Sequence, residues 1–357
     1  MFYLTKMKFI DLLSQVKFPA RIFNDLGIRI SYFLKLSYVP FLPSSLDIEP
    51  VNYCNFRCPH CQVTHWQKEK KELDYKSFET LIKKLPQLIW IKIQGMGEPL
   101  LNKDLIPMLR LGNERSIRMS FTSNGSIFNR NIAEKVANLD NTSITFSIDG
   151  ASAGVFEKIR VGSRFESVCQ NIKQLTEIIG QSDKSPQVKA WMVVTKSNLR
   201  EVGDVVSLVE RLGVRSITFQ LFLNDWGKSE MSSYIDDIKL ISNNLSSKEI
   251  VLDLEQAKKI AKEIGVEIRI YYGDFYTKKR ICSWPWKSSY ICANGDVVPC
   301  SILADSETVK MGNVFENSLS EIWNSEKYRN FRDQHINHDL PSYCRHCYLE
   351  CEVNSKD

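Results

Sequence analysis

The segment Cys54-Asn55-Phe56-Arg57-Cys58-Pro59-His60-Cys61 places three cysteines at CxxxCxxC spacing, directly after an apolar run at residues 46–51. Iron–sulfur clusters are normally held by four cysteines, so three thiolates leave one iron without a protein ligand. An open coordination position usually indicates chemistry, as it does at catalytic zinc. The segment therefore predicts a reactive cluster, while a zinc site or three unrelated loop thiols stay open as alternatives. His60 receives no ligand role, because a lone loop histidine can equally face solvent.

From residue 47 onward, β-like runs alternate with helical stretches. We expect strands at residues 46–51, 88–93, 117–121, 143–148, 188–194 and 216–221, with a last core strand at 267–271. We expect helices at residues 76–84, 131–138, 168–179 and 204–212. This α/β alternation predicts a parallel sheet with crossover helices. Six such units fit a partial (β/α)6 TIM-type barrel, in which functional residues lie on the loops after the strands.

Four short motifs lie at the ends of these expected strands or soon after them. They are Gly95-Met96-Gly97-Glu98-Pro99, Thr122-Ser123-Asn124-Gly125, Ser147-Ile148-Asp149-Gly150 and Lys158-Ile159-Arg160-Val161-Gly162. Taken alone, each also fits an ordinary turn or, for Arg160, a solvated side chain. Together with the CxxxCxxC segment they resemble the radical S-adenosylmethionine (SAM) superfamily. Met96 departs from the Gly-Gly form of the family's GGEP motif.

The resemblance implies a cofactor and its contacts. SAM would chelate the open iron of a 4Fe-4S cluster held by Cys54, Cys58 and Cys61. The GGEP-like backbone would receive the SAM amino group, the two following motifs would border the ribose, and an arginine would pair with the carboxylate. A planar guanidinium suits a carboxylate because it can donate to both oxygens. The SAM contacts that the resemblance implies are Gly95, Gly97, Glu98, Ser123, Ser147 and Arg160.

A second group of cysteines lies near the end of the chain. Its order, together with the GN and EIWN stretches at residues 312–313 and 321–324, resembles the SPASM/twitch extension of radical SAM enzymes. The short ending CxxCxxxC favours a twitch-like form with one auxiliary 4Fe-4S cluster. The four ligands that this resemblance implies are Cys282, Cys300, Cys344 and Cys347. Cys292 and Cys351 are left over, and either could replace one of the four.

A structural zinc ribbon is the alternative interpretation of this tail, because histidines lie close to its CxxC pair. They are His335, His338 and His346, which we expect on the surface of a polar segment. Trp284 and Trp286 are expected to pack in the core.

Composition limits the remaining possibilities. The chain has 357 residues, a net charge of +5, 43% hydrophobic residues and ten cysteines. The modest charge does not indicate nucleic acid as a partner. With no signal peptide, no transmembrane segment and no regular disulfide pattern, we expect a cytoplasmic protein. We expect a basic amphipathic extension at residues 1–46, a barrel at 47–273 and a cluster-binding domain at 274–357.

The N-terminal extension has helical spacing of Phe9, Leu12, Leu13 and Val16 among basic residues. This pattern fits either a helix packed on the barrel or one that binds a membrane surface or a partner.

The resemblance implies reductive cleavage of SAM to a 5′-deoxyadenosyl radical, which abstracts a hydrogen from the substrate. We expect a small-molecule substrate, such as an alcohol or sugar, oxidised with help from the auxiliary cluster. A peptide-modifying maturase is one alternative, and a non-catalytic iron–sulfur or zinc protein is another. The expected electron donor is a flavodoxin or ferredoxin. No general base can be chosen from the sequence.

Overall fold

The computed structural model describes residues 18–184, 186–221, 223, 248–271, 276–277 and 279–348. The helix expected around Phe9 to Val16 and the cysteine at position 351 lie outside these residues.

A single ten-stranded sheet runs through the molecule in the order β10-β9-β8-β1-β2-β3-β4-β5-β6-β7. Its strands are β1 Ser45–Ile48, β2 Trp90–Ile93, β3 Arg118–Ser123, β4 Thr142–Ser147, β5 Gln187–Val193, β6 Ser216–Gln220, β7 Glu267–Tyr271, β8 Ser288–Ile291, β9 Asp296–Val298 and β10 Gly312–Asn313. Neighbours from β8 through β1 to β7 are parallel, and β9 and β10 are antiparallel. The predicted α/β class with a parallel barrel-type sheet is confirmed.

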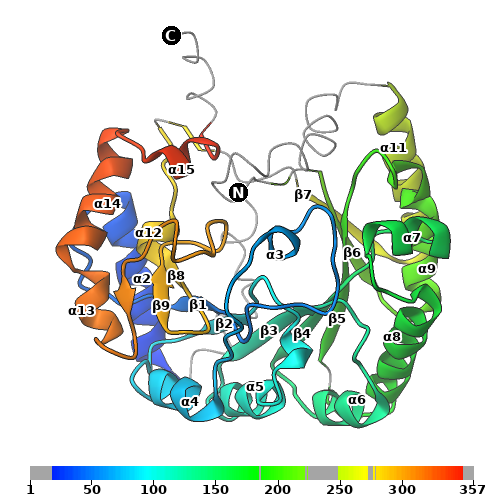
Figure 1. The fold of residues 1–357 in the computed structure, drawn as a ribbon, viewed down its shortest axis with the longest axis horizontal. Helices are drawn as coiled ribbons and strands as arrows, with labels where there is room; N and C mark the ends of the chain where they lie inside the picture. Colours follow the sequence, from blue (N-terminus) through cyan, green and yellow to red (C-terminus); the bar gives the residue numbers. More distant parts are fainter. Residues whose placement is uncertain are drawn as a thin grey trace.

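Helices cover the outer side of this curved sheet (Figure 1). In the first part of the chain they are α2 Pro19–Phe33, α3 Gln62–His65, α4 Tyr75–Lys83, η1 Pro99–Leu101, α5 Leu105–Glu114, α6 Arg130–Ala137, α7 Ala153–Ile159 and α8 Phe165–Gly180. They continue with η2 Leu199–Glu201, α9 Val202–Arg211, α11 Lys248–Ile264, α12 Trp284–Lys287, α13 Leu319–Trp323, α14 Glu326–Asn337 and α15 Ser342–Arg345. Capping side chains fix the residue at which several helices begin. Asp74 accepts from the Ser77 amide at the start of α4, and Asn129 accepts from the Ile132 amide at the start of α6.

The two faces of the sheet differ in polarity. Successive side chains of a strand point to opposite faces, and the face toward the helices carries core residues such as Ile48, Ile93 and Phe121. The other face is polar. One register row places four of its residues side by side on β1 to β4, namely Asp47, Lys92, Ser120 and Ser143. We call this inner side the polar face.

Strand β8 is the main departure from the expected architecture. The C-terminal segment does not stand apart, because β8 pairs with β1 and extends the barrel sheet with β9 and β10. The domain limits at residues 46 and 273 stay predictions, with the sheet continuing across the second of them.

Two expectations about single residues have different outcomes. Trp286 is fully buried, as expected. The expectation that His335 lies on the surface is wrong, since its side chain is only 2% exposed and packs edge-on against Phe331. The polar sequence of α14 hides a buried stripe at i, i+3, i+4 and i+7 spacing, which places His335 on the inner side of the helix.

Candidate active site and cysteine clusters

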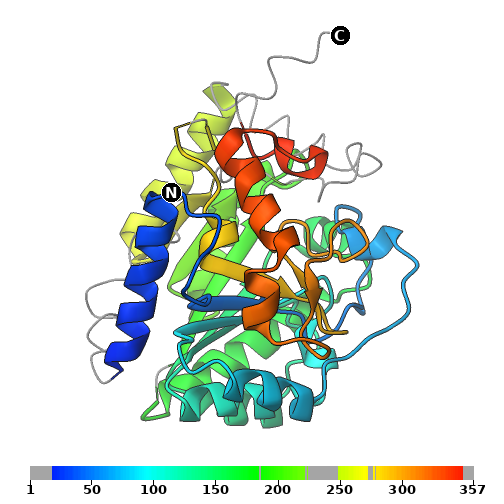
Figure 2. The same cartoon turned by 90° about the vertical axis from the view of Figure 1, so that its left-hand side faces the viewer.

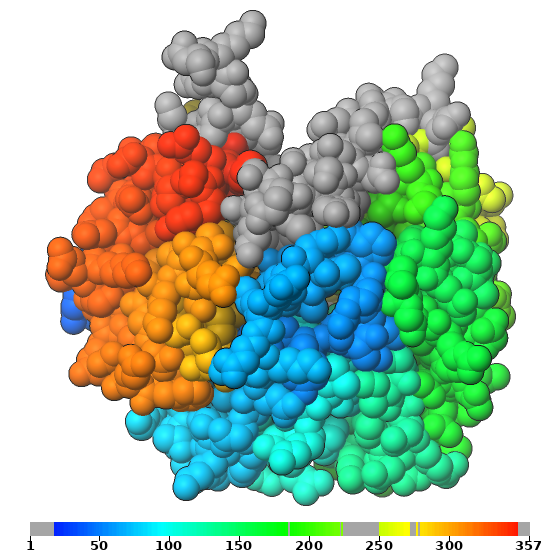
Figure 3. Space-filling view, viewed as in Figure 1, coloured from blue at the N-terminus to red at the C-terminus, as the bar shows by residue number. Residues whose placement is uncertain are grey.

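The loop after β1 brings Cys54, Cys58 and Cys61 together. The Cys61 amide donates to the Cys58 carbonyl at 3.0 Å, and the Thr64 hydroxyl donates to the same carbonyl at 2.8 Å. Burial, with smaller contributions from the neighbouring Cys58 and Cys54 thiols, raises the pKa of the Cys61 thiol to about 12. Local hydrogen bonds therefore hold three thiols in one place at the carboxyl end of a barrel strand. The segment from β1 to α4, in blue, crosses the face of the molecule shown in Figure 3.

Residues after β2 and β3 support this loop from the side. The Glu98 carboxylate accepts from the Asn124 amide at 2.7 Å, the Ser123 hydroxyl at 2.8 Å and the Leu100 amide at 3.2 Å. The Asn124 side chain donates to Asn55 at 2.9 Å and lies 3.9 Å from the Cys54 sulfur. Burial raises the pKa of Glu98 to about 7. Glu98 and Ser123 thus lie at the predicted site, and both bond protein groups there.

The two predicted glycines lie where the β2 loop passes very close to the β1 loop. A Cβ on Gly97 would lie 2.3 Å from the Tyr53 carbonyl oxygen, and one on Gly95 would lie 2.4 Å from Cγ of Glu49. Any larger residue would therefore push the two loops apart. The glycines place the GGEP-like motif beside the cysteine loop.

Arg160 reaches the cysteines from the loop after α7. Its Nε and its terminal nitrogen both lie 2.6 Å from the Asp149 carboxylate. The guanidinium also bonds the Cys58 sulfur, which lowers the pKa of that thiol, although burial has the larger effect and raises it. The side chain of Arg160 is 13% exposed, so the solvated-arginine alternative is wrong. Ser147, at the carboxyl end of β4, is 9% exposed.

Two polar side chains beside the cysteines are buried without a partner among the described residues. Both amide atoms of Gln62, which follows Cys61, lack a hydrogen bond, and so does the Ser163 hydroxyl. Leaving such groups unsatisfied costs about 1–3 kcal/mol each. A polar ligand next to the cysteines would satisfy them, so the residues present fit a bound cluster and SAM.

The second cysteine set comes from three separate segments. Burial raises the pKa of the Cys344 thiol, and the neighbouring thiols of Cys300, Cys282 and Cys347 raise it further. The structure therefore brings together the four cysteines that the resemblance to SPASM/twitch domains implies. Within the described ranges, no three Cys, His, Asp or Glu side chains are grouped around a single metal ion, as a structural zinc site would require.

Tyr348 ties the second set together. Its hydroxyl accepts from the Cys282 amide at 2.8 Å and lies 2.8 Å from Nδ1 of His335. Its ring lies 5.5 Å from the ring of Tyr276, whose amide donates to the Cys347 carbonyl at 2.8 Å. The second set is therefore enclosed by aromatic side chains.

Cys292 lies apart from this set. After burial, the carboxylates of Glu49, Asp296 and Asp305 have the largest effect on the pKa of its thiol, and they raise it. The structure gives no support for exchanging Cys292 with one of the four, and Cys351 lies outside the described residues.

Buried charges on β1 and β2 lie near Cys300 of the second set. Burial raises the pKa of Asp47 to about 6, while Lys92 and a hydrogen bond from Ser301 lower it. Just after the end of β1, the Glu49 carboxylate accepts from the Tyr290 hydroxyl and from the Ala293 amide, each at 3.1 Å. Because Ser301 follows Cys300, Asp47 connects the polar face to the second set.

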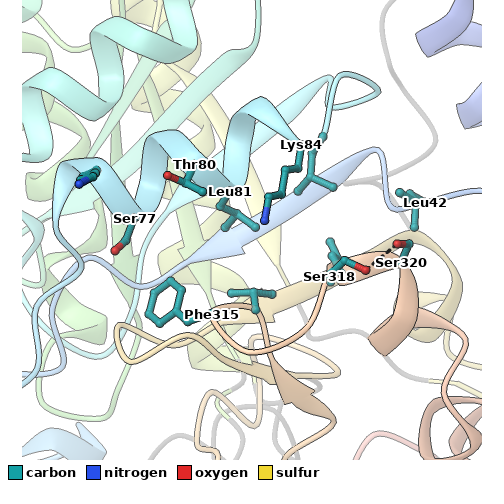
Figure 4. A pocket seen from close by; sticks show the side chains of 12 residues that line it. Leu42, Ser77, Thr80, Leu81, Lys84, Phe315, Ser318 and Ser320 are labelled. Carbon is teal, nitrogen blue, oxygen red and sulfur yellow. Dashed lines mark hydrogen bonds between the residues drawn. The ribbon is translucent and has the colours of Figure 1, made fainter.

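A separate cavity of about 290 Å³ lies away from both cysteine sets, between α4 and the segment that leads into α13 (Figure 4). Its lining includes Thr80 of α4 and Lys84 just after that helix, with Ser318 and Ser320 on the other side. None of its lining residues belongs to either cysteine set.

Two family models match this chain. The radical SAM superfamily model matches residues 48–220, and the SPASM iron–sulfur cluster-binding domain matches residues 282–348. The chain carries a radical SAM domain followed by a SPASM domain. The matched ranges contain both cysteine sets, so this radical SAM protein is an enzyme that binds SAM, a 4Fe-4S cluster and auxiliary iron–sulfur clusters. The zinc-ribbon and non-catalytic alternatives are therefore wrong.

Curated relatives share about a quarter of its residues. A tungsten-containing aldehyde ferredoxin oxidoreductase cofactor-modifying protein from Pyrococcus furiosus is 27% identical over 85% of this chain and 87% of its own. An AdoMet-dependent heme synthase from Methanosarcina barkeri is 26% identical over 78% of this chain and 82% of its own. The mycofactocin maturase MftC from Mycobacterium ulcerans is 27% identical over 48% of this chain and 45% of its own.

Solved structures confirm the fold. Streptococcus suis SuiB bound to S-adenosylmethionine superposes with a TM-score of 0.61 at 16% identity, covering 82% of this chain and 68% of SuiB. Within the described residues, every helix is too short or too polar to span a membrane.

Several residues at the site were not predicted from the sequence. Asn124 and Asp149 belong to motifs that were recognised, yet they received no role. Glu49 and Gln62 flank the cysteine segment on either side, and only their burial distinguishes them. The sequence did contain a signal for these residues: each is a polar residue at the end of a core strand or next to a ligand cysteine.

Proposed function

We propose that this radical SAM enzyme acts on a polar small molecule held against the polar face, between the two cysteine sets. SAM bound at the first cluster supplies a 5′-deoxyadenosyl radical that abstracts a substrate hydrogen. We assign the first cluster to Cys54, Cys58 and Cys61, and the auxiliary cluster to Cys282, Cys300, Cys344 and Cys347. We assign the SAM contacts to Gly95, Gly97, Glu98, Ser123, Ser147 and Arg160.

The polarity of the inner side of the sheet is the observation that carries the proposal. Indole and hydroxyl groups there bond neighbouring strands: Trp90 donates to Ser120 at 2.9 Å, and Trp191 donates to Gln220 at 2.7 Å. The indole N–H groups are used within the sheet, while the Ser120 hydroxyl can still donate to a ligand. A hydroxyl-rich substrate suits this lining better than a hydrocarbon does.

Asp47 is the residue that we propose accepts a proton when the substrate is oxidised. Conversion of an alcohol carbon to a carbonyl removes one hydrogen atom, one proton and one electron. Bound SAM would supply the radical that removes the hydrogen atom, and a cluster held by Cys300 and its partners would accept the electron. The buried Asp47 carboxylate, beside Cys300, is placed to take the proton. Lys92, the electrostatic partner of Asp47, would stabilise the carboxylate before the transfer.

The names of the relatives that match most of the chain support a small molecule. One modifies a cofactor and another is a heme synthase, and both matches cover more than three quarters of this chain. A cytoplasmic location and a flavodoxin or ferredoxin as reductant are further parts of the proposal.

The test is SAM cleavage under anaerobic conditions with a chemical reductant. We expect release of 5′-deoxyadenosine to rise when a low-molecular-mass ultrafiltrate of the source cells is added. We expect the Cys54/Cys58/Cys61→Ala variant to release none with or without it. Absence of SAM cleavage by the reconstituted wild type would overturn the proposal.

Peptide modification is the second candidate, favoured by the match to mycofactocin maturases over 48% of the chain. In the same assay it predicts stimulation by the peptide fraction of the extract and none by the ultrafiltrate. Asp47→Asn separates the candidates further. If the enzyme oxidises a small molecule, this variant should form no product but should continue to cleave SAM without turnover of the substrate.

A further inference from the structure

Helix α2 presents an unusually apolar surface to solvent. Five large apolar side chains on α2 and on the residue after it are exposed. Their exposed fractions are 68% for Phe23, 54% for Leu26, 49% for Ile30, 82% for Phe33 and 57% for Leu34. At 100° per residue these positions fall within about one third of the helix circumference. We call these five residues the α2 stripe.

The opposite side of α2 is firmly attached to the barrel. The Arg21 guanidinium donates to the carbonyls of Arg115 at 2.8 Å and of Pro86 and Ser116 at 3.0 Å. At the other end, the Tyr32 hydroxyl donates to the Ile281 carbonyl at 2.7 Å. The stripe is therefore exposed because the anchored helix turns it outward.

The α2 stripe is remote from the cysteine loop. Figure 2 shows α2, in dark blue, along one edge of the molecule, while the segment that contains α3 lies at the opposite edge. A binding partner on the stripe would leave access to the barrel open from the other side.

Positive charge is concentrated in the same part of the chain. Residues 1–46 contain six basic and two acidic residues, a net +4 of the +5 carried by the whole chain. The basic residues are Lys6, Lys8, Lys17, Arg21, Arg29 and Lys35, and the acidic ones are Asp11 and Asp25. An exposed apolar stripe beside net positive charge is the composition of helices that lie in the interface of anionic membranes.

We propose that the α2 stripe docks on an anionic membrane surface, with the stripe inserted among the acyl chains and the exposed Arg29 and Lys35 at the headgroups. A second copy of the chain fits less well, because a symmetric contact would bring two net positive segments together. The proposal concerns peripheral attachment of the enzyme and is independent of its substrate.

Vesicle co-sedimentation of the full-length, cluster-loaded protein tests this proposal. We expect at least about tenfold stronger binding to vesicles of phosphatidylcholine with phosphatidylserine than to phosphatidylcholine alone, and weaker binding at high salt. The Phe23→Ser/Ile30→Ser/Phe33→Ser variant should lose at least about tenfold in binding. Leu252→Ser is the matched control, since Leu252 is 67% exposed on the separate helix α11 and should bind like wild type.

Iron content and thermal unfolding of each variant establish that it is folded. Should the triple variant fail to fold, Phe33→Ser alone, at the most exposed position, is expected to weaken binding several-fold. Wild type that ignores both kinds of vesicle would overturn the proposal, as would a triple variant that binds normally. A wild-type dimer that dissociates in the triple variant during sedimentation velocity would assign the stripe to a second copy instead.

Discussion

The two cysteine sets are built in opposite ways. The first lies within eight residues of one loop, is held by local hydrogen bonds and is surrounded by charged groups such as Arg160 and Glu98. The second gathers cysteines from three segments and is enclosed by the rings of Tyr276, Tyr348 and His335. A local, polar loop can receive a small ligand without disturbing the fold, whereas a set that joins distant segments contributes to the fold itself.

Cysteine substitutions test this contrast with the largest expected effect. The Cys54/Cys58/Cys61→Ala variant should drop from about eight iron atoms to about four, lose SAM cleavage entirely and keep its unfolding temperature. Cys344→Ala/Cys347→Ala should lose a similar amount of iron and also unfold at a lower temperature. Iron analysis and calorimetry measure both.

Cys292→Ala is the matched control for these substitutions and should keep the full iron content. An equal loss of stability in the two cysteine variants would remove the distinction between the sets.

The charged surroundings of the first set give the next largest effect. Arg160→Met leaves the fully buried Asp149 carboxylate without its partner, and we expect a loss of about 3–5 kcal/mol in the free energy of unfolding. Arg130→Met removes the exposed pair with Glu134 and should cost less than about 0.5 kcal/mol. Denaturant titration measures both, and similar values for the two would show that the Arg160–Asp149 pair is not buried in solution.

Glu49 lies between the Gly95 backbone and the Ala293 amide. Its burial predicts that the stability of the fold depends on pH. Burial raises its pKa from 4.5 to about 7. Between these pH values the unfolded chain loses the proton while the folded chain keeps it, so the free energy of unfolding should fall as pH rises. The fall should be about 3 kcal/mol.

Glu49→Gln should remove that part of the pH dependence, as measured by denaturant titration at several pH values. The exposed substitution Glu134→Gln should retain it. A Glu49→Gln profile parallel to wild type would contradict the assignment.

The smallest expected effect comes from the aromatic enclosure of the second set. Tyr348→Phe leaves the Cys282 amide without its acceptor, and we expect a cost of about 1 kcal/mol. Iron of the second set should then pass to a chelator about fivefold faster, because 1 kcal/mol corresponds to roughly that factor. Tyr38→Phe, at a 58% exposed position, should leave the rate unchanged. Faster release from the first set instead would show that Tyr348 does not protect the second.

The sequence predicts the barrel well because its signals are local. Each expected strand at residues 46–221 lies within two residues of an observed one at its N-terminal end, since apolar runs and turn residues mark strands directly. The burial of His335 and the pairing of β8 with β1 depend on contacts between distant segments. Only the helical spacing of Tyr328, Phe331 and Arg332 hints at the burial of His335, and no local pattern predicts the pairing of β8 or the roles of Glu49 and Asp149.

The pairing of β8 with β1 has a consequence for how the protein is made. Ser45 pairs with Ser288, so β1 leaves the ribosome 243 residues before the strand that covers its free edge. At typical synthesis rates this delay lasts roughly 10 to 50 s. During that interval β1 presents an open edge to other chains. Slow synthesis or overexpression should therefore favour aggregation of nascent chains, and chaperones that shield strand edges should raise the yield of the complete enzyme.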